Sequence, residues 1–284
     1  MSIQTIGIIG AGTMGNGIAQ ACSAAGLQAV LQDVSEPALA RALKTISGSL
    51  DRAVRKGTLT EEAKAAVLGR IRTTTAAQDL AEADLVIEAA TENEAIKIRI
   101  LQAVDAIARP GTIIATNTSS ISITRLAAAT QRPDRFVGMH FFNPVPVMAL
   151  VEIIRGLRTS EATVEAVADL ARTLGKTPIG VKNSAGFVVN RILCPMINEA
   201  IFTLQEGLAS AEEIDAGMRL GCNHPIGPLA LCDLVGLDVQ LAVMDVLYSN
   251  FNDSKYRPAP LLREMVDAGM LGRKTGRGFY TYEK

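Results

Sequence analysis

The stretch IQTIGIIGAGTMGNGIAQ, residues 3–20, decides the fold of this chain. It opens with a short apolar run that is typical of a strand, and it continues through a glycine-rich turn into helical spacing. The helix is expected to end near Ala25, because Gly26 stands where a C-cap glycine belongs. The next apolar run, QAVLQDV, predicts a second strand that ends near Asp33. Together these segments predict a strand–helix–strand unit with parallel strands.

The turn contains the pattern Gly-x-Gly-x-x-Gly at Gly10, Gly12 and Gly15, with Thr13 and Met14 between the last two. Gly10 permits a tight turn, Gly12 lets the backbone approach a pyrophosphate, and Gly15 lets the helix pack closely on the strand. The helix start presents N–H groups and a positive dipole end to phosphates. These five residues are therefore predicted to bind a dinucleotide.

Asp33, at the end of the second strand, is expected to accept hydrogen bonds from the adenosine ribose hydroxyls. A carboxylate there repels a 2′-phosphate, and no arginine follows before Arg41. The predicted cofactor is therefore NAD rather than NADP. The alternative is a glycine-rich turn on a fold that binds nothing.

Strand and helix patterns alternate along residues 1–184. The runs ADLVIEAA and GTIIATN are nearly continuously apolar, as in parallel strands that are buried on both faces. A charge-rich helical excursion is expected at about 36–70. This region is predicted to be an α/β domain, a Rossmann-type doubly wound sheet that binds NAD.

From about residue 185 the spacing becomes helical, so residues 185–284 are predicted to form a smaller all-α domain for substrate binding and dimerisation. Ser210 and Glu213 match a capping box, and Gly221 is expected to end the helix that they begin.

The composition is that of an ordinary globular protein, with 48% hydrophobic and 20% charged residues and a net charge of −1. This balance favours neither nucleic acid nor a membrane surface as a partner. The first residues lack the pattern of a secretory leader, so a cytoplasmic location is expected. Cys222, His224 and Cys232 fit no common zinc spacing, and no metal is expected.

One of the two histidines lies in the segment MHFFNPVPVMALVE, residues 139–152. His140 and Glu152 stand on either side of two prolines, and a chain reversal near Pro146 would bring them opposite one another. A neutral imidazole can then act as a general base, and the carboxylate can fix its tautomer. The alternative is a satisfied core histidine beside an unrelated carboxylate.

The run TNTSS directly follows a predicted strand, and ligands bind beyond the carboxyl ends of such strands. Ser119 is therefore a candidate hydrogen-bond partner for a substrate oxygen. An ordinary Ser/Thr turn is the alternative, since such runs often serve that purpose.

Six segments, in order, resemble those of the 3-hydroxyacyl-CoA dehydrogenase family, and most closely its short, free-standing bacterial members. They are GIIGAGTMGNGIAQ, IEAATENEAIK, NTSSISIT, GMHFFNPVPVMALVEII, GFVVNRI and GRKTGRGFY. The resemblance spans essentially the whole chain. It implies NAD-dependent oxidation of an (S)-3-hydroxyacyl-CoA, with 3-hydroxybutyryl-CoA and acetoacetyl-CoA as the expected pair.

The resemblance also implies roles for individual residues. His140 is the catalytic base, Glu152 its partner, and Ser119 and Asn190 contact the substrate oxygen. Cofactor contacts fall on Asp33, Glu92, Lys97, Ser119, Asn143 and Lys274. Coenzyme A contacts fall on Ser49 and Lys56. A basic helical face agrees with the last assignment, although a solvated face is the plainer interpretation; it consists of Arg41, Lys44, Arg52, Arg55 and Lys56.

Three other functions remain open from the sequence. A 3-hydroxyadipyl-CoA dehydrogenase would have nearly the same sequence pattern. A non-catalytic NAD-binding relative should have lost His140, Glu152 or Asn190, and all three are present. A dehydrogenase of free sugar acids does not need the HFFNPVP segment or the basic face. Apolar stretches in the helical domain favour a homodimer.

Overall fold

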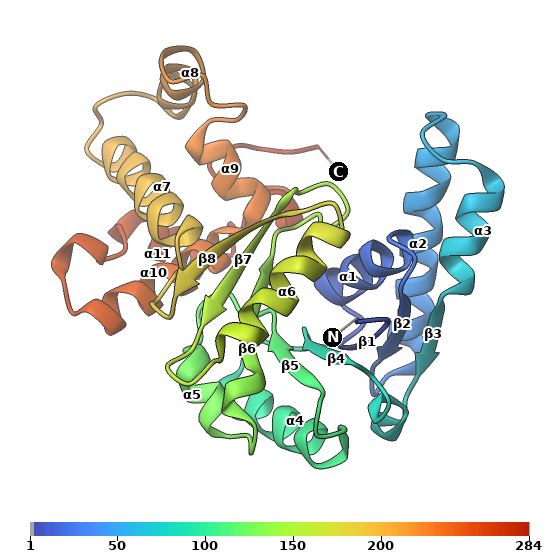
Figure 1. Ribbon diagram of the computed structural model, residues 1–284. Coiled ribbons are helices and arrows are strands. Elements are labelled where there is room, and N and C mark those ends of the chain that lie inside the picture. Colours follow the sequence, from blue (N-terminus) through green and yellow to red (C-terminus); the bar gives the residue numbers. More distant parts are fainter. Residues whose placement is uncertain (1–2, 284) are drawn as a thin grey trace. The chain divides into compact units, whose positions relative to one another are not determined.

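The computed structural model describes residues 3–283, and the chain separates into two compact units, Met1–Ser184 and Ala185–Lys284. The first unit contains one sheet with helices on both faces, and the second is helical (Figure 1). The predicted fold class, a Rossmann-type sheet followed by a smaller all-α domain, is confirmed.

The sheet of the first unit has eight strands in the order β3-β2-β1-β4-β5-β6-β7-β8. Their bounds are β1 (Thr5–Ile9), β2 (Gln28–Gln32), β3 (Ile71–Thr74), β4 (Leu85–Glu88), β5 (Ile113–Thr116), β6 (Phe136–Phe141), β7 (Leu150–Arg155) and β8 (Thr177–Lys182). The strands from β3 to β6 in this order pair in parallel, β7 is antiparallel to β6, and β8 is parallel to β7. The direction of strand progression reverses between β1 and β4. In open sheets this switch point is where dinucleotides bind.

The helices of the first unit are α1 (Thr13–Ala24), α2 (Glu36–Arg55), α3 (Glu61–Gly69), α4 (Glu94–Ile107), α5 (Ile123–Ala128) and α6 (Glu161–Thr173), with short 3₁₀ turns at Ala77–Leu80 and Pro133–Arg135. The predicted excursion at 36–70 consists of two helices. Gly57 has a positive φ of 71° after α2, and the Thr60 side chain caps α3. Gly26, with φ 91°, ends α1 as expected.

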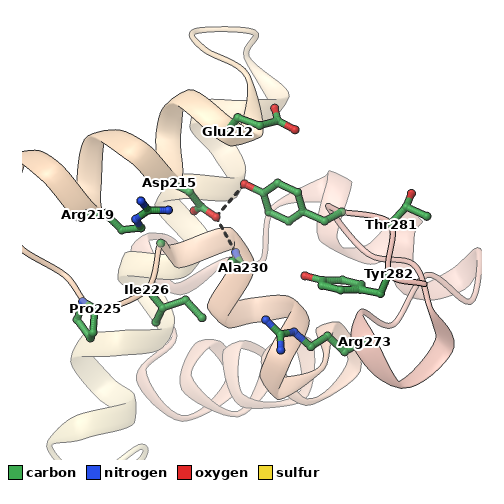
Figure 2. Close-up of a pocket in the computed structure, with 11 residues that line it drawn as sticks. Glu212, Asp215, Arg219, Pro225, Ile226, Ala230, Arg273, Thr281 and Tyr282 are labelled. Atoms are coloured by element: carbon green, nitrogen blue, oxygen red, sulfur yellow. Dashed lines mark hydrogen bonds between the residues drawn. The ribbon is translucent and has the colours of Figure 1, made fainter. Parts of the chain in front are cut away.

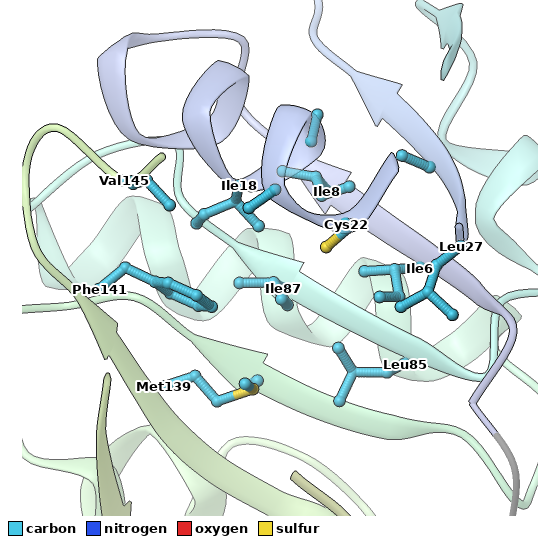
Figure 3. Close-up of a cluster of buried hydrophobic side chains, with 14 of the residues drawn as sticks. Ile6, Ile8, Ile18, Cys22, Leu27, Leu85, Ile87, Met139, Phe141 and Val145 are labelled. Carbon is cyan, nitrogen blue, oxygen red and sulfur yellow. The ribbon is translucent and has the colours of Figure 1, made fainter. Parts of the chain in front are cut away.

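One buried apolar cluster joins α1, α2, α3 and α6 to the same face of the sheet (Figure 3). On β6, Met139 and Phe141 point into this cluster. Because side chains alternate along a strand, Gly138 and His140 face the other side. That second face is covered by α4 and α5; a Cβ on Gly138 would lie 2.9 Å from the Ile123 side chain of α5.

The second unit contains α7 (Val189–Gln205), α8 (Ala211–Gly221), α9 (Pro228–Val235), α10 (Leu237–Phe251) and α11 (Pro260–Asp267), with 3₁₀ turns at Ser254–Tyr256 and Arg273–Thr275. Ser210 and Glu213 form the predicted capping box. The helix ends at Gly221 as predicted, and the residue that takes the left-handed conformation after it is Asn223, with φ 57°. Asparagine tolerates that conformation better than most side chains. None of the helices within residues 3–283 is long and apolar enough to cross a membrane.

Two buried aspartates hold the last residues of the second unit in place. Asp215 accepts hydrogen bonds from the backbone N–H groups of Leu229 and Ala230, at the start of α9, and from the Tyr280 hydroxyl at 2.9 Å (Figure 2). Asp233 accepts from the Tyr280 backbone N–H and from the Tyr282 hydroxyl, each at 3.0 Å. Burial and the bond to Asp215 raise the pKa of Tyr280. The tyrosines line a cavity of 660 Å³ within this unit.

Candidate active site

The surroundings of the three glycines in the loop between β1 and α1 agree with the reason predicted for each of them. A Cβ on Gly10, at φ 98°, would lie 2.5 Å from the Ala90 Cα, and one on Gly15 would lie 1.7 Å from the Gly10 carbonyl oxygen. Gly12 is different, since within residues 3–283, its two chain neighbours apart, no atom lies within 4 Å of an added Cβ. Gly12 therefore leaves space for a ligand, and Thr13 beside it is exposed.

Asp33 lies next to this loop, just past β2. Its Oδ2 accepts a hydrogen bond from the Ala11 backbone N–H at 2.8 Å, and its Oδ1 accepts from the Ser35 N–H at 3.0 Å. The carboxylate is half-buried, and these two hydrogen bonds hold it beside Ala11, the neighbour of Gly12. A glycine loop, a helix start and a carboxylate in this arrangement fit a dinucleotide with unmodified ribose hydroxyls.

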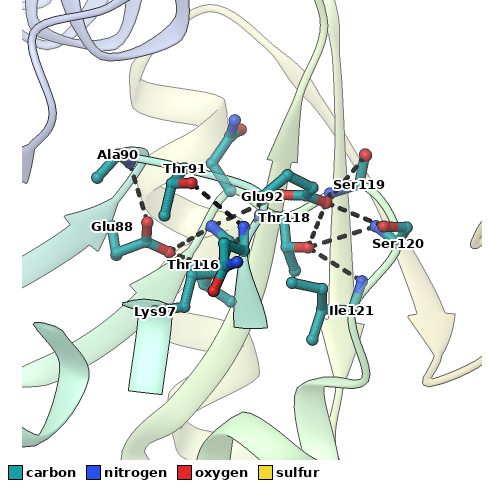
Figure 4. A network of polar contacts seen from close by, with 12 residues as sticks. Glu88, Ala90, Thr91, Glu92, Lys97, Thr116, Thr118, Ser119, Ser120 and Ile121 are labelled. Carbon is teal, nitrogen blue, oxygen red and sulfur yellow. Dashed lines mark hydrogen bonds and ion pairs between the residues drawn. The ribbon is translucent and has the colours of Figure 1, made fainter. Parts of the chain in front are cut away.

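The loop after β5 is tied to the loop after β4 through Glu92 (Figure 4). Glu92 Oε1 accepts hydrogen bonds from the Thr118 hydroxyl at 2.7 Å, from the Ser119 N–H at 2.9 Å and hydroxyl at 3.1 Å, and from the Ser120 hydroxyl at 3.0 Å. Three of these four donors do not involve the Ser119 hydroxyl. That hydroxyl can therefore turn to another acceptor without leaving the carboxylate unpaired.

Lys97 is almost fully buried beneath this loop. Its Nζ lies 2.6 Å from Glu88 Oε2 and 3.7 Å from Glu92 Oε2, and its side chain is 2% exposed. Glu88 also accepts from the Thr116 hydroxyl and the Ala90 N–H. Glu88 was not among the predicted residues. A carboxylate in the apolar run ADLVIEAA indicates a buried charge that needs a partner, but the run does not show which residue that partner is.

His140 and Glu152 are register partners on β6 and β7. His140 Nδ1 lies 2.7 Å from Glu152 Oε2, and the residues are 6% and 0% exposed. The Phe142 ring lies 4.6 Å from the imidazole, centroid to centroid. The chain reversal expected near Pro146 is therefore present, and the two side chains that it was expected to pair are in contact.

Several of the predicted cofactor-binding and catalytic residues of the first unit lie at one edge of the sheet. Because β1, β4, β5 and β6 are parallel, their carboxyl ends share an edge, and it bears the glycine loop, Glu92, Ser119 and His140. Asn143, just past β6, is exposed. Asn117 links two of these loops, since its Oδ1 accepts from the Phe141 N–H at 2.9 Å.

The residues expected to contact coenzyme A lie on or next to α2. Ser49 is half-buried and accepts a hydrogen bond from Gln20 Nε2 at 3.2 Å, and Lys56 is the exposed C-cap of α2. All five side chains of the basic face are exposed, namely Arg41, Lys44, Arg52, Arg55 and Lys56.

Two further predicted residues belong to the second unit. Asn190 is half-buried in the first turn of α7. Lys274 donates to Asp238 Oδ1 at 2.5 Å, and its side chain is 45% exposed.

This fold and this edge of the sheet define a dinucleotide-dependent dehydrogenase, in which a buried histidine–carboxylate pair lies near a glycine-loop cofactor site. Residues 5–184 match the model of the 3-hydroxyacyl-CoA dehydrogenase NAD-binding domain, and residues 186–282 match that of the C-terminal domain. The chain belongs to the 3-hydroxyacyl-CoA dehydrogenase family, and its first unit contains the family's NAD-binding domain.

Several relatives match over nearly all of this chain. A 3-hydroxybutyryl-CoA dehydrogenase of Bradyrhizobium diazoefficiens is 54% identical, over 99% of this chain and 96% of its own. The solved (S)-3-hydroxybutyryl-CoA dehydrogenase of Ralstonia eutropha is 65% identical, with a TM-score of 0.97 and full coverage of both chains. A 3-hydroxyadipyl-CoA dehydrogenase of Escherichia coli is 42% identical over 99% of this chain and 60% of its own.

Proposed function

We propose that this protein interconverts (S)-3-hydroxybutyryl-CoA and acetoacetyl-CoA, using NAD. The observation that carries the proposal is the buried contact of 2.7 Å between His140 Nδ1 and Glu152 Oε2 at the edge that bears the glycine loop. The relatives named for this reaction support the choice of substrate. Asp33 favours NAD over NADP, because its carboxylate repels a 2′-phosphate.

His140 is the proposed general base. When its Nδ1–H donates to Glu152, Nε2 is the basic nitrogen, and it takes the proton of the 3-hydroxyl group. Glu152 holds the ring in this tautomer and stabilises the imidazolium that forms. NAD, when bound, supplies the acceptor for the hydride that leaves C3. In the reductive direction the protonated His140 returns the proton to the oxygen.

The substrate oxygen is held by Ser119 and Asn190 in this proposal. The Ser119 backbone N–H and its neighbours keep Glu92 paired while the Ser119 hydroxyl turns to the substrate. The proposed cofactor contacts are Gly10, Gly12, Thr13, Met14, Gly15, Asp33, Glu92, Ser119, Asn143 and Lys274. Lys97 is buried, so we propose that it acts by holding Glu92.

Ser49, Lys56 and the exposed basic face on and next to α2 are the proposed site for the phosphates of coenzyme A. The proposed domains are residues 1–184 for NAD and 185–284 for substrate binding and dimerisation. Large apolar side chains on the second unit are exposed, including Ile192 at 67% and Leu220 at 81%. Such side chains favour a homodimer, and a cytoplasmic enzyme is consistent with the buried free thiols.

A second candidate substrate is 3-hydroxyadipyl-CoA, since one relative has that name. The 3-hydroxyadipyl chain is two carbons longer than the 3-hydroxybutyryl chain and ends in a carboxylate. A site for the longer substrate needs a cation there, so the ratio of kcat/KM values for the two thioesters separates the candidates.

The test compares NADH oxidation with acetoacetyl-CoA and with free acetoacetate, for the wild type and for His140→Gln. We expect turnover with the thioester alone and a loss of about 10²–10⁴-fold in the variant. A wild type that binds NADH but reduces neither this thioester nor a carboxylated one would refute the proposed function.

A further inference from the structure

The connection between β6 and β7, residues 142–149, lies next to His140. It begins at the carboxyl end of β6, the edge that also bears the glycine loop. Phe142 in this connection contacts the His140 ring, and Asn143 next to it is exposed. A shift of this connection would therefore move Phe142 against the His140 ring and would also move the exposed Asn143.

Lys176 is a buried lysine that the proposed chemistry does not use. It is 8% exposed and directly precedes β8. Its Nζ donates to the Val145 carbonyl oxygen at 2.6 Å and to the Met148 carbonyl oxygen at 2.8 Å. The charge thus bonds to two backbone groups of the β6–β7 connection. Within residues 3–283, no carboxylate forms an ion pair with it.

An ammonium group in this position is costly. Burial lowers the pKa of Lys176, because the surroundings disfavour its charged form. Neutral carbonyls compensate a buried charge less than a carboxylate does, so an apolar side chain would suit the surroundings better. Lys176 instead holds the carbonyl groups of Val145 and Met148, both in the β6–β7 connection, at a fixed distance from one another.

The same connection is also held by α1. Val145 is 2% exposed and belongs to the apolar cluster that includes Ile18 and Cys22 of α1 (Figure 3). A Cβ on Gly17 would lie 2.9 Å from the Val145 Cβ. The helix that begins at the glycine loop therefore touches the connection directly, with no room for a larger side chain.

We propose that Lys176 is a positioning residue that holds the β6–β7 connection against α1 and so sets the place of Phe142 and Asn143 beside the nicotinamide end of the cofactor site. It touches neither cofactor nor substrate and acts through the backbone at Val145 and Met148. Its effect on turnover rests on the proposed function, whereas its effect on cofactor affinity rests on the NAD-binding domain alone.

The test uses Lys176→Met, which keeps the length of the side chain, and Lys176→Arg, which keeps charge and donors. Lys182→Met is the matched control. Lys182 is exposed at the carboxyl end of β8, and because β8 is antiparallel to β6 it lies at the opposite edge of the sheet. The measurements are the NADH dissociation constant by fluorescence, kcat and both KM values with acetoacetyl-CoA, and the melting temperature.

We expect Lys176→Met to raise the dissociation constant and KM for NADH about tenfold and to lower kcat by a similar factor, because a displacement of about 1 Å near the reacting atoms has effects of this size. The KM for acetoacetyl-CoA should stay within about twofold of the wild type. Lys176→Arg should recover most of the loss, and Lys182→Met should match the wild type.

A lower melting temperature with unchanged NADH affinity and kcat would mean that Lys176 only stabilises the fold, and the proposal would be overturned. If Lys176→Met does not fold, Gly17→Ala displaces the same connection through its contact with Val145 and must give the same rise in the NADH constants. If the wild type does not reduce acetoacetyl-CoA, the proposed function fails, and the NADH dissociation constants still decide the role of Lys176.

Discussion

Glu152 on β7 lies directly opposite His140 on the neighbouring strand β6, and His140 Nδ1 lies 2.7 Å from Glu152 Oε2. Neither residue is more than 6% exposed. The carboxylate fixes which imidazole nitrogen has the proton. Because the pair is buried, this effect is not screened by water. The proposed role of His140 as a base depends on this contact.

Glu152→Gln should lower kcat for acetoacetyl-CoA reduction by about 10²–10⁴-fold, because an amide neither fixes the tautomer nor stabilises the imidazolium. The NADH dissociation constant should not change. The matched control is Glu161→Gln, which alters an exposed pair with Arg155. Near-normal turnover by Glu152→Gln would contradict the role assigned to the pair.

Gly12→Ala separates cofactor binding from folding. The added Cβ meets no atom within 4 Å in the described part of the chain beyond the neighbours of Gly12, and the φ of Gly12, −69°, suits alanine. We therefore expect an unchanged melting temperature and a loss of NADH affinity of about tenfold or more, since the methyl group occupies the space where the backbone should approach the pyrophosphate. Fluorescence titration measures this loss. Gly111→Ala, at another open position, is the control; equal affinities for both variants would place the cofactor elsewhere.

The ion pair between Glu88 and Lys97 should be tested with a double-mutant cycle. Lys97→Met leaves a fully buried carboxylate that still accepts hydrogen bonds from the Thr116 hydroxyl and the Ala90 N–H but has lost its cation, and should lower the free energy of unfolding by about 3–5 kcal/mol. Adding Glu88→Gln removes the unpaired charge and should restore much of the loss. Urea denaturation measures both effects. Independent, additive losses would show that the two side chains do not interact.

The sequence predicted those parts of the site that depend on local spacing. The glycine loop, Asp33 and the His140–Glu152 pair follow from a strand–turn–helix pattern and from one chain reversal. Glu88 and Lys176 could not be found in this way. Their partners, Lys97 and the Val145 carbonyl oxygen, come from other elements, so only the packing of α4 and β8 brings them together.

The fold shows the same limit. Gly26 and Gly221 were both correctly predicted to end their helices, but the left-handed residue after α8 is Asn223, which the sequence pattern did not indicate. The helical excursion expected at about 36–70 consists of two helices, because Gly57 and the Thr60 cap divide it. The sequence pattern did not show this division. A helical pattern indicates that helices are present more reliably than where each one ends.

The lowered pKa of Asp84 indicates how the stability of the protein should depend on pH. Its Oδ2 accepts hydrogen bonds from the Gln4 N–H at 2.8 Å and the Thr5 N–H at 2.9 Å, which tie the chain before β1 to the residue before β4, and Arg109 lies 2.9 Å from Oδ1. Burial acts to raise the pKa of Asp84, but the bonds from Thr5 and Gln4 and the charge of Arg109 outweigh it, so the pKa lies below its ordinary value.

A carboxylate with a lower pKa in the folded state stabilises the protein above its unfolded pKa, which is about 3.9 for aspartate, and this contribution is lost as the pH falls through the folded pKa. Asp84→Asn should therefore lower the free energy of unfolding by about 1 kcal/mol at neutral pH, a value reduced by the partial exposure of the group. The difference from the wild type should shrink as the pH falls below the unfolded pKa of about 3.9 and through the lower folded pKa. Urea denaturation across this range measures it, with Asp169→Asn, in an exposed pair with Arg172, as the control. A difference that stays constant with pH would mean that the Asp84 charge is not what holds the chain before β1 in place.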